Sequence, residues 1–290
     1  MITLALRITK FCLAFLLALF LGSCKVEVET PLFNSIKGSG KVIAETRNIQ
    51  EEFDKIHVSS NIEVELEQSP NYQITVEADD NLIPYVLTEV EQGTLRIRFD
   101  KVSITNTKEV KVYVKMPNIS GLKATSSSEI EAKSDIKSES LTVFSGSTAE
   151  IKLLDVRAKY VTVEATSSSD IQINQIYAFE LNANTTSTAD FEAFVEADRI
   201  NVKASSSSDV ELKGKALDFF VEASSTATIN ARDLIANNIT ATASSSSTIK
   251  VFPVVSLKAQ ASSTGDIYYY NEPKNIDKNS SSAGSVRYKK

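Results

Sequence analysis

The sequence contains a single histidine, His57, and this limits the chemistry that the chain could perform. A Ser-His-Asp triad needs a histidine beside its nucleophile, and histidine-rich zinc sites need several. His57 lies in the alternating segment Lys55-Ile56-His57-Val58, where a strand would turn it toward solvent. We therefore expect a surface residue rather than a catalytic base, and we expect no cofactor.

Serine is abundant, but no serine cluster is flanked by a histidine, and no Gly-x-Ser-x-Gly turn occurs. A serine nucleophile requires an adjacent base, so abundance alone does not indicate catalysis. The chain has nine glycines and carries no glycine fingerprint for phosphates or dinucleotides. The sequence predicts no catalytic residue and a protein that is not an enzyme.

Acidic residues form the one recurrent pattern of charged side chains. Five of them each precede a recurrent apolar residue: Glu129, Glu150, Asp170, Asp190 and Asp209. If these positions stack, their carboxylates repel one another unless water and salt screen them. A solvated acidic column is the expected arrangement. A column bridged by a cation such as Ca²⁺ is the alternative metal site.

The balance of charge also excludes some partners. The 290 residues include 37 acidic and 31 basic ones, which gives a formal net charge of −6, and 42% are hydrophobic. This composition is sufficient for a buried core and too acidic for a typical nucleic-acid-binding protein. We expect no nucleic-acid partner.

The first 23 residues predict an export signal. Arg7 and Lys10 precede the apolar run Phe11–Leu21, which is too short to span a bilayer. Leu21-Gly22-Ser23-Cys24 then resembles the bacterial lipobox, in which the leader is cleaved before a cysteine that receives a lipid. We expect a lipoprotein signal peptide, lipidation of Cys24, and a membrane partner through that anchor. An ordinary signal peptide is the alternative. The expected location is the cell envelope, at the outer membrane or cell surface.

Two segments are expected between the leader and residue 121. Residues 24–40 contain Pro31, Gly38 and Gly40 and predict a tether. Residues 41–120 alternate apolar and polar side chains and predict a β-rich N-terminal part. Within it, the segment Asp79–Leu87 has capping residues and Pro84 and predicts one short helix.

From residue 121 to 290 the sequence repeats every 18 to 21 residues. Each repeat has a serine-rich cluster, a polar residue and then an apolar residue. The apolar residues are Ile130, Ile151, Ile171, Phe191, Val210, Ile229, Ile249, Ile267 and Val286. A unit of this length with strand-like alternation is typical of one coil of a β-solenoid. The fold class predicted is therefore all-β, a single-stranded parallel β-helix.

Stacking at about 4.8 Å would join the apolar faces of successive coils into one core. Alanines near the ends of the alternating runs would stack at a tight inner corner: Ala124, Ala165, Ala183, Ala204, Ala223, Ala243 and Ala261. The serines would lie at the bends and bond to backbone groups there. Tyr268, Tyr269 and Tyr270 would close the open end of the stack, or alternatively stack on a sugar ring.

Several strings resemble the auto-transporter adhesin, head GIN domain family of secreted and lipid-anchored Bacteroidetes proteins. They are Phe53-Asp54-Lys55-Ile56-His57-Val58-Ser59-Ser60, Asp79-Asp80-Asn81-Leu82-Ile83, Gly93-Thr94-Leu95-Arg96-Ile97 and the later serine-rich coils. The resemblance covers roughly residues 41–290. It implies a β-helical domain, right-handed in the expected form, and adhesion by analogy. It supplies no catalytic or binding residues.

Together these features predict a non-catalytic cell-envelope lipoprotein. Its long polar faces would serve as an adhesin or binding scaffold for a surface polysaccharide, a host glycan or another envelope protein. The alternative is a carbohydrate-active β-helix enzyme, such as a polysaccharide lyase or hydrolase. An enzyme should depend on single exposed acids, whereas a binding face should lose affinity gradually over several coils.

Overall fold

The structure is a computed structural model that describes residues 35–100, 103–105 and 110–290. The expected leader, Cys24 and most of the expected tether lie outside these residues. The described part consists of β-strands joined by turns, with one 3₁₀ turn and no α-helix. No helix in this part is long and apolar enough to cross a membrane. The all-β prediction is confirmed.

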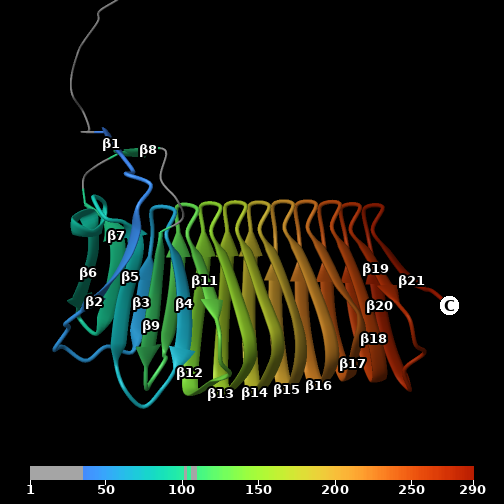
Figure 1. Cartoon of the computed structure of the whole chain (residues 1–290). Coiled ribbons are helices and arrows are strands. Elements are labelled where there is room, and N and C mark those ends of the chain that lie inside the picture. Colours follow the sequence, from blue (N-terminus) through green and yellow to red (C-terminus); the bar gives the residue numbers. More distant parts are fainter. Residues whose placement is uncertain (1–34, 101–102, 106–109) are drawn as a thin grey trace, which may run out of the picture. The chain divides into compact units, whose positions relative to one another are not determined.

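A β-solenoid of about eight turns forms most of the described chain. Its long strands are parallel, each hydrogen-bonded to the next in sequence. They are β12 (Ile136–Gly146), β13 (Glu150–Thr166), β14 (Asp170–Thr186), β15 (Asp190–Ala204), β16 (Asp209–Ala223), β17 (Thr228–Ala243) and β18 (Thr248–Ala261). Figure 1 shows these coils side by side, with their tight turns aligned along one edge.

Each coil has three straight segments. The pairing of β13 with β14 is interrupted at Leu154 and again at Lys159. We call the stacks that contain residues 150–153, 155–158 and 160–166 the first, second and third face. On every face alternate side chains point inward, and Ile151, Val156 and Val161 are fully buried. The three faces therefore enclose one continuous apolar core.

The predicted apolar column is confirmed residue by residue. Ile151 is in register with Ile130 on one side and with Ile171 on the other. The same register continues through Phe191, Val210, Ile229, Ile249, Ile267 and Val286. All but Val286, in the last coil, are buried.

The serine clusters form the tight turns, as predicted. The two central residues of each turn have positive φ, for example Ser167 at 62° and Ser168 at 59°. Two successive positive φ values are typical of a type I′ turn, which usually contains Asn or Gly. Here hydrogen bonds between turns hold the conformation: the amide of Thr148 donates to the carbonyl of Ser167, and the amide of Ser168 donates to that of Ser187.

The N-terminal coils do not stack in the order of the chain. The coil of β3 (Lys55–Val58) and β4 (Glu63–Gln68) lies between two coils that follow it in sequence. One of these contains β7 (Thr94–Phe99) and β9 (Lys111–Met116). The other contains β10 (Gly121–Thr125) and β11 (Glu129–Ala132). The fold therefore needs contacts between segments that are distant in sequence.

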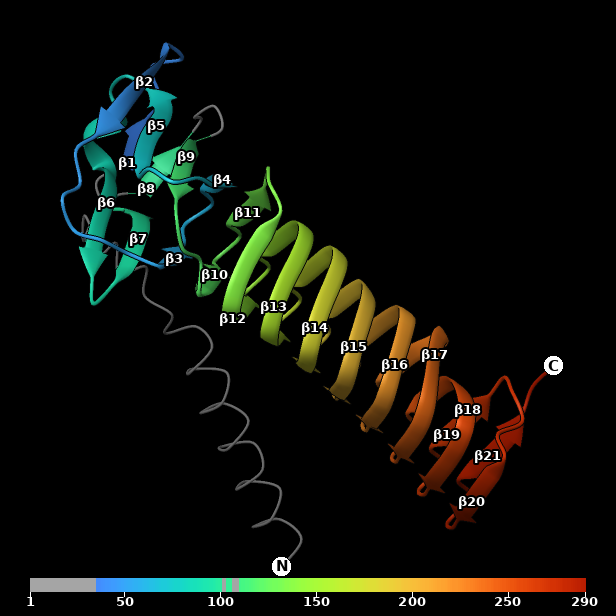
Figure 2. The same ribbon diagram turned by 90° about the horizontal axis from the view of Figure 1, so that it is seen from below.

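Antiparallel strands cover the outer edge of the coil that contains β7 and β9. β5 (Gln73–Asp79) pairs with β9 and with β2 (Val42–Arg47), and β6 (Val86–Glu91) pairs with β7. Figure 2 shows these strands at the N-terminal end of the solenoid. They satisfy backbone groups that an open parallel edge would leave unpaired.

The prediction of a short helix within Asp79–Leu87 is wrong. Only a 3₁₀ turn, η1 (Ile83–Tyr85), forms there, with no side-chain cap. Asp79 instead ends β5 and is buried, so it cannot begin a helix. Val86 is extended and starts β6 at once. The strand pairing thus outweighs the local signal from Pro84.

Two further details differ from the sequence predictions. Ala183 is not in the inner corner: it pairs with Val163 and Val202, and Thr185 takes the place between Ala165 and Ala204. The range assigned to the tether also contains a strand, β1 (Ser35–Lys37), which pairs with β8 (Ser103–Thr105).

The C-terminal end of the solenoid is formed by β19 (Asp266–Tyr269), β20 (Asn275–Ser280) and β21 (Ser285–Tyr288). Of the three tyrosines only Tyr269 is buried, and its ring lies 5.4 Å from that of Tyr288. The coil of β20 and β21 stacks beyond it. The tyrosines therefore do not form the outermost layer that the sequence suggested.

Candidate functional site

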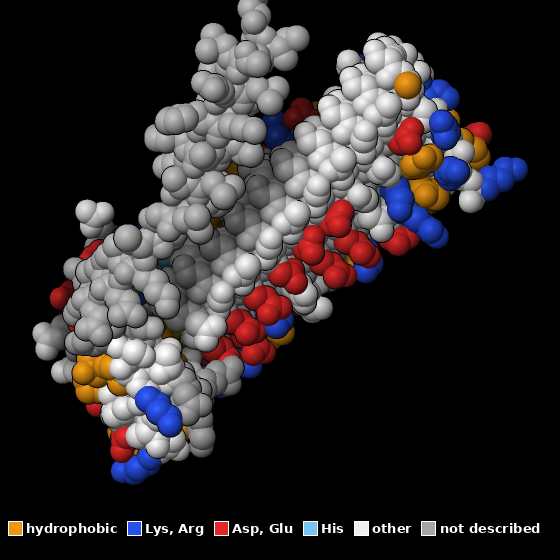
Figure 3. Space-filling view, turned by 90° about the horizontal axis from the view of Figure 1, so that it is seen from above, with side chains coloured by type: hydrophobic (Ala, Val, Ile, Leu, Met, Phe, Trp, Pro, Cys, Tyr) orange, Lys and Arg blue, Asp and Glu red, His pale blue; other side chains and the backbone are white. Residues whose placement is uncertain are grey.

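The five acids of the predicted column do stack on the first face. Glu129, Glu150, Asp170, Asp190 and Asp209 are in register on consecutive coils. Glu63 of β4 extends the column toward the N-terminus. Each acid follows the tight turn and starts a strand, so its side chain points outward while the next residue points into the core. Figure 3 shows carboxylates gathered in a strip along the solenoid.

Lysines neutralise one end of this column. Lys152 Nζ lies 3.1 Å from Glu129 Oε1 and 2.8 Å from Glu150 Oε1. The hydrogen bond to Glu150 is the largest reason why the pKa of Lys152 is raised. One ammonium group is thus shared by two carboxylates on neighbouring coils.

Within the part of the chain that the structure describes, no lysine forms an ion pair with the next acids, Asp170, Asp190 and Asp209. Burial raises the pKa of Asp170, and the neighbouring charges of Glu150 and Asp190 raise it further. Burial is also the main reason why the pKa of Asp190 is raised, followed by the charge of Asp209. These two carboxylates are therefore the least favourably ionised part of the column.

A second outward row lies two residues further along the same strands. It contains Lys152, Gln172, Glu192, Glu211, Asn230 and Lys250. Lys213 Nζ joins two acids of this row, at 3.2 Å from Glu192 Oε1 and 2.9 Å from Glu211 Oε1. The row thus has a carboxylate pair at its centre, with an amide and then an ammonium group on either side.

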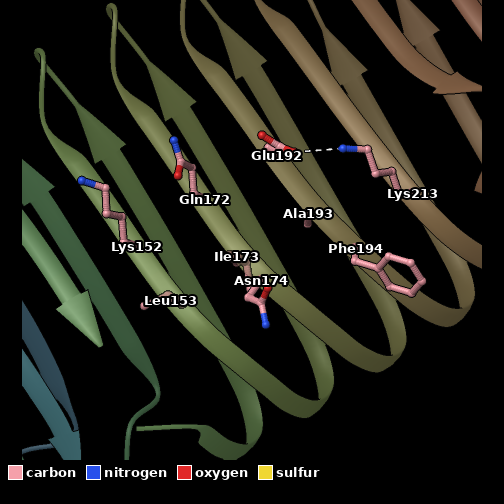
Figure 4. Close-up of a pocket in the computed structure, with 9 residues that line it drawn as sticks. All are labelled: Lys152, Leu153, Gln172, Ile173, Asn174, Glu192, Ala193, Phe194 and Lys213. Carbon is pink, nitrogen blue, oxygen red and sulfur yellow. Dashed lines mark hydrogen bonds and ion pairs between the residues drawn. The ribbon is translucent and has the colours of Figure 1, made fainter. Parts of the chain in front are cut away.

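Two shallow hollows adjoin on this face, with volumes of about 420 and 520 Å³, and they share Gln172 and Glu192. We call them together the first-face groove. Figure 4 shows Lys152, Gln172, Glu192 and Lys213 along its side, with Ile173 and Ala193 at its base. Phe194 lies at its rim and is 40% exposed. The groove is open along its length and polar along its sides.

A register shift sets which residue of the preceding coil lies beside Phe194. The pairing of β14 with β15 shifts between Ile173 and Gln175, which leaves Asn174 as an extra residue. Phe194 then pairs with Gln175, and the phenyl ring points outward. The sequence analysis did not single out Phe194 and Gln172. Each lies beside an inward residue, Val195 and Ile171, in a simple alternation, so that pattern could have placed both on the surface.

The first-face groove is not arranged as a metal centre. Within the residues that the structure describes, no group of three or more His, Cys, Asp or Glu side chains is placed to hold a metal ion. Bridging of the acidic column by a cation stays a prediction, which melting temperatures measured with Ca²⁺ and with a chelator would test.

His57 lies on the third face, away from this groove. It is half-buried on β3, and its Nε2 lies 3.3 Å from Thr125 Oγ1. Burial lowers the pKa of His57, and the charges of Lys123 and Arg96 lower it further. The lipidation site expected at Cys24 lies outside the described residues.

A stack of parallel coils with an antiparallel cover defines this protein as a β-solenoid. Its family is shown by sequence: the model of the family described as "Putative auto-transporter adhesin, head GIN domain" matches residues 52–174 and 161–273. The chain belongs to that family. No protein of curated function is detectably similar to it.

Solved structures share the fold. A "putative adhesin" from Parabacteroides merdae has a TM-score of 0.70 at 19% identity, covering 89% of this chain and 100% of that one. A "putative adhesin" from Parabacteroides distasonis has a TM-score of 0.68 at 20% identity, covering 88% and 100%. A "putative lipid binding protein" from the same species has a TM-score of 0.63 at 20% identity, covering 89% and 100%.

Proposed function

We propose that the protein is a non-catalytic lipoprotein of the cell envelope that binds glycans along its first-face groove. The supporting observation is that the polar side chains of this groove repeat in register over successive coils. A repeated set of contacts suits a polymer with repeating units better than it suits one small substrate. Binding would therefore be spread over several coils.

The chemistry of the groove fits a sugar chain. Carboxylates such as Asp190 and Glu192 accept hydrogen bonds from hydroxyls, and the amide of Gln172 can both donate and accept. The exposed ring of Phe194 offers an apolar surface for stacking at the rim. An open groove also admits a chain from either end, whereas enclosed pockets suit small ligands.

The family name and the lipobox-like sequence support an envelope location. Lipidation of Cys24 would anchor the chain at the outer membrane or cell surface, and residues from 25 onward would connect the anchor to the solenoid. Replacing the acceptor, Cys24→Ala, should move the protein from the membrane fraction to the soluble fraction of cells. A matched Cys12→Ala change inside the leader should leave it in the membrane fraction. Equal distribution of both variants would contradict the anchor.

The alternative function is a carbohydrate-active enzyme, and one observation favours it. Asp170 and Asp190 have raised pKa values and line the groove, as a general acid would. However, burial and then the like charges of neighbouring carboxylates account for the raised pKa values, and neither requires a catalytic role. The non-catalytic function is therefore the simpler explanation.

One experiment separates these two functions. The protein is applied to a glycan array, and the bound glycans are then incubated with it and assayed for new reducing ends. Binding without release supports the proposed function. Release of reducing ends that is lost in Asp170→Asn or Asp190→Asn would establish the enzyme instead.

A further inference from the structure

A row of positively charged side chains lies on the third face near the N-terminal end. Arg96 of β7 is in register with His57 of β3, and His57 is in register with Lys123 of β10. Phe144 of β12 follows in the same row. Figure 2 shows these four strands in succession at the start of the solenoid. We call these four residues the basic row.

The charges in this row are only partly compensated. Arg96 Nε lies 2.6 Å from Glu91 Oε2, and its neighbour Arg98 is bonded to Glu89 at 2.9 Å. Within the described part of the chain, no ion pair joins Lys123 to a carboxylate. Its ammonium group lies instead over the ring of Phe144, at 4.7 Å from the ring centroid. Lys123 is exposed, so the ring orients it and leaves it accessible.

The same row changes character further along the solenoid. Beyond Phe144 it continues through Glu164, Asn184, Lys203 and Glu222. There Lys203 Nζ is paired with Glu222 Oε2 at 3.1 Å. The uncompensated positive charge is therefore confined to the first coils. It also lies on a different face from the acids of the first-face groove, which would repel an anionic ligand.

We propose that the basic row is a binding site for an acidic polysaccharide, with Lys123 and His57 contacting its carboxylate or sulfate groups. Neighbouring strands repeat the contact at about 4.8 Å, which suits a polymer with regularly placed charges. Thr125 and Thr142 on the same strands provide hydroxyls for hydrogen bonds to the sugar. No member of the row is a large exposed apolar side chain that could insert into a membrane.

Occupancy of this site should depend on pH. The charged groups facing His57 are Lys55 on its own strand, Arg96 on β7 and Lys123 on β10, while Glu89 and Glu91 of β6 face Arg96. Burial, and then the charges of Lys123 and Arg96, lower the pKa of His57 in the free protein. A bound anion opposes that effect and favours the imidazolium. Binding should therefore strengthen as the pH falls through the range in which His57 titrates.

The test uses the full-length protein with polygalacturonate, dextran sulfate and neutral dextran, titrated by calorimetry at low salt. The two acidic polymers should bind and neutral dextran should not. At about pH 5, Lys123→Gln and His57→Gln should each weaken binding by about fivefold, as expected for one exposed charge contact. Binding by the wild type should be stronger at about pH 5 than at about pH 8, and His57→Gln should remove this dependence.

Lys203→Gln is the matched control, because it removes a lysine from the same row outside the proposed site. It should bind like the wild type, and all three variants should keep the wild-type circular dichroism and melting temperature. The proposal is overturned if Lys123→Gln and Lys203→Gln bind equally, or if neutral dextran binds as well as the acidic polymers. Binding to anionic lipid vesicles without binding to the polymers would also overturn it. None of these outcomes bears on the first-face groove, since its residues are unchanged.

Discussion

Ser169 Oγ lies 2.8 Å from the carbonyl oxygen of Ser145, which belongs to the preceding coil. The same hydroxyl accepts a hydrogen bond from the amide of Thr166, at 3.1 Å. Equivalent buried serines occur only in every second coil, at Ser128, Ser169, Ser208 and Ser247. The intervening coils have alanine there, at Ala149, Ala189 and Ala227. The structural repeat is therefore two coils rather than one.

Replacing a buried turn serine should destabilise the solenoid. Ser169→Ala leaves the amide of Thr166 and the carbonyl of Ser145 without this partner in a buried place, at a cost of about 1–3 kcal/mol. Ser167→Ala is the control, because Ser167 is exposed in the same turn and should change stability by less than about 0.5 kcal/mol. Urea unfolding measures both. Equal effects would show that the buried hydroxyl contributes nothing.

The apolar column should be even more sensitive. Ile171 is fully buried between Ile151 and Phe191, so Ile171→Ala removes packed methyl groups and leaves a cavity. A loss of about 2–5 kcal/mol in the free energy of unfolding is expected. Gln172→Ala, the next residue, points outward and should have little effect. A small loss for Ile171→Ala would mean that the coils do not share one core.

The sequence was sufficient to predict this column because its period is nearly constant from Ile130 to Val286. It was insufficient where the register shifts. Ala183 precedes its turn by two residues more than the other alanines do, so it faces the interior of the third face instead of the corner. The insertion of the β3–β4 coil between later coils was also missed. Stacking order depends on long-range pairing, and no local pattern encodes it.

Gly214 should not tolerate a side chain. Its φ is +115°, and a Cβ atom there would lie 2.2 Å from the carbonyl oxygen of Val195. Because the obstacle is backbone of the adjacent coil, Gly214→Ala should lower stability by about 1–3 kcal/mol. Gly146→Ala is the comparison, since Gly146 has ordinary φ and a Cβ there would meet only side chains, the ring of Phe144 at 3.1 Å and Cγ2 of Thr166 at 3.4 Å. Thermal unfolding that ranks the two variants in the opposite order would contradict this explanation.

The acidic column should make stability depend on pH. Burial raises the pKa of Asp190 in the folded protein, because the ionised carboxylate is less stable there than in the unfolded chain. The loss of folding stability caused by this charge is therefore absent at low pH and develops as the pH rises through that pKa. Asp190→Asn should therefore raise the melting temperature near neutral pH. The difference from the wild type should disappear below about pH 4, where both side chains are neutral. Melting curves over this pH range provide the measurement. A difference in melting temperature that does not change with pH would contradict the role of Asp190 ionisation.

The candidate site was predictable only in part. The acids from Glu129 to Asp209 could be placed in one column, because each precedes a residue of the apolar column. The groove itself depends on the small side chain of Ala193 at its base and on Phe194 at its rim. Alternation along β15 turns Ala193 inward and Phe194 outward, but the hollow forms only where neighbouring coils stack, and no local pattern gives its shape.

The most direct test of the proposed function is a calorimetric titration of the array-selected glycan with Asp170→Asn, Asp190→Asn, Asp209→Asn and the triple variant. A binding face distributed over three coils predicts about two- to fivefold weaker binding for each single change. For the triple variant it predicts a fold reduction in affinity close to the product of the three single reductions. It also predicts that no reducing ends are released. Complete loss of binding from one substitution, or unchanged binding by the triple variant, would contradict the account.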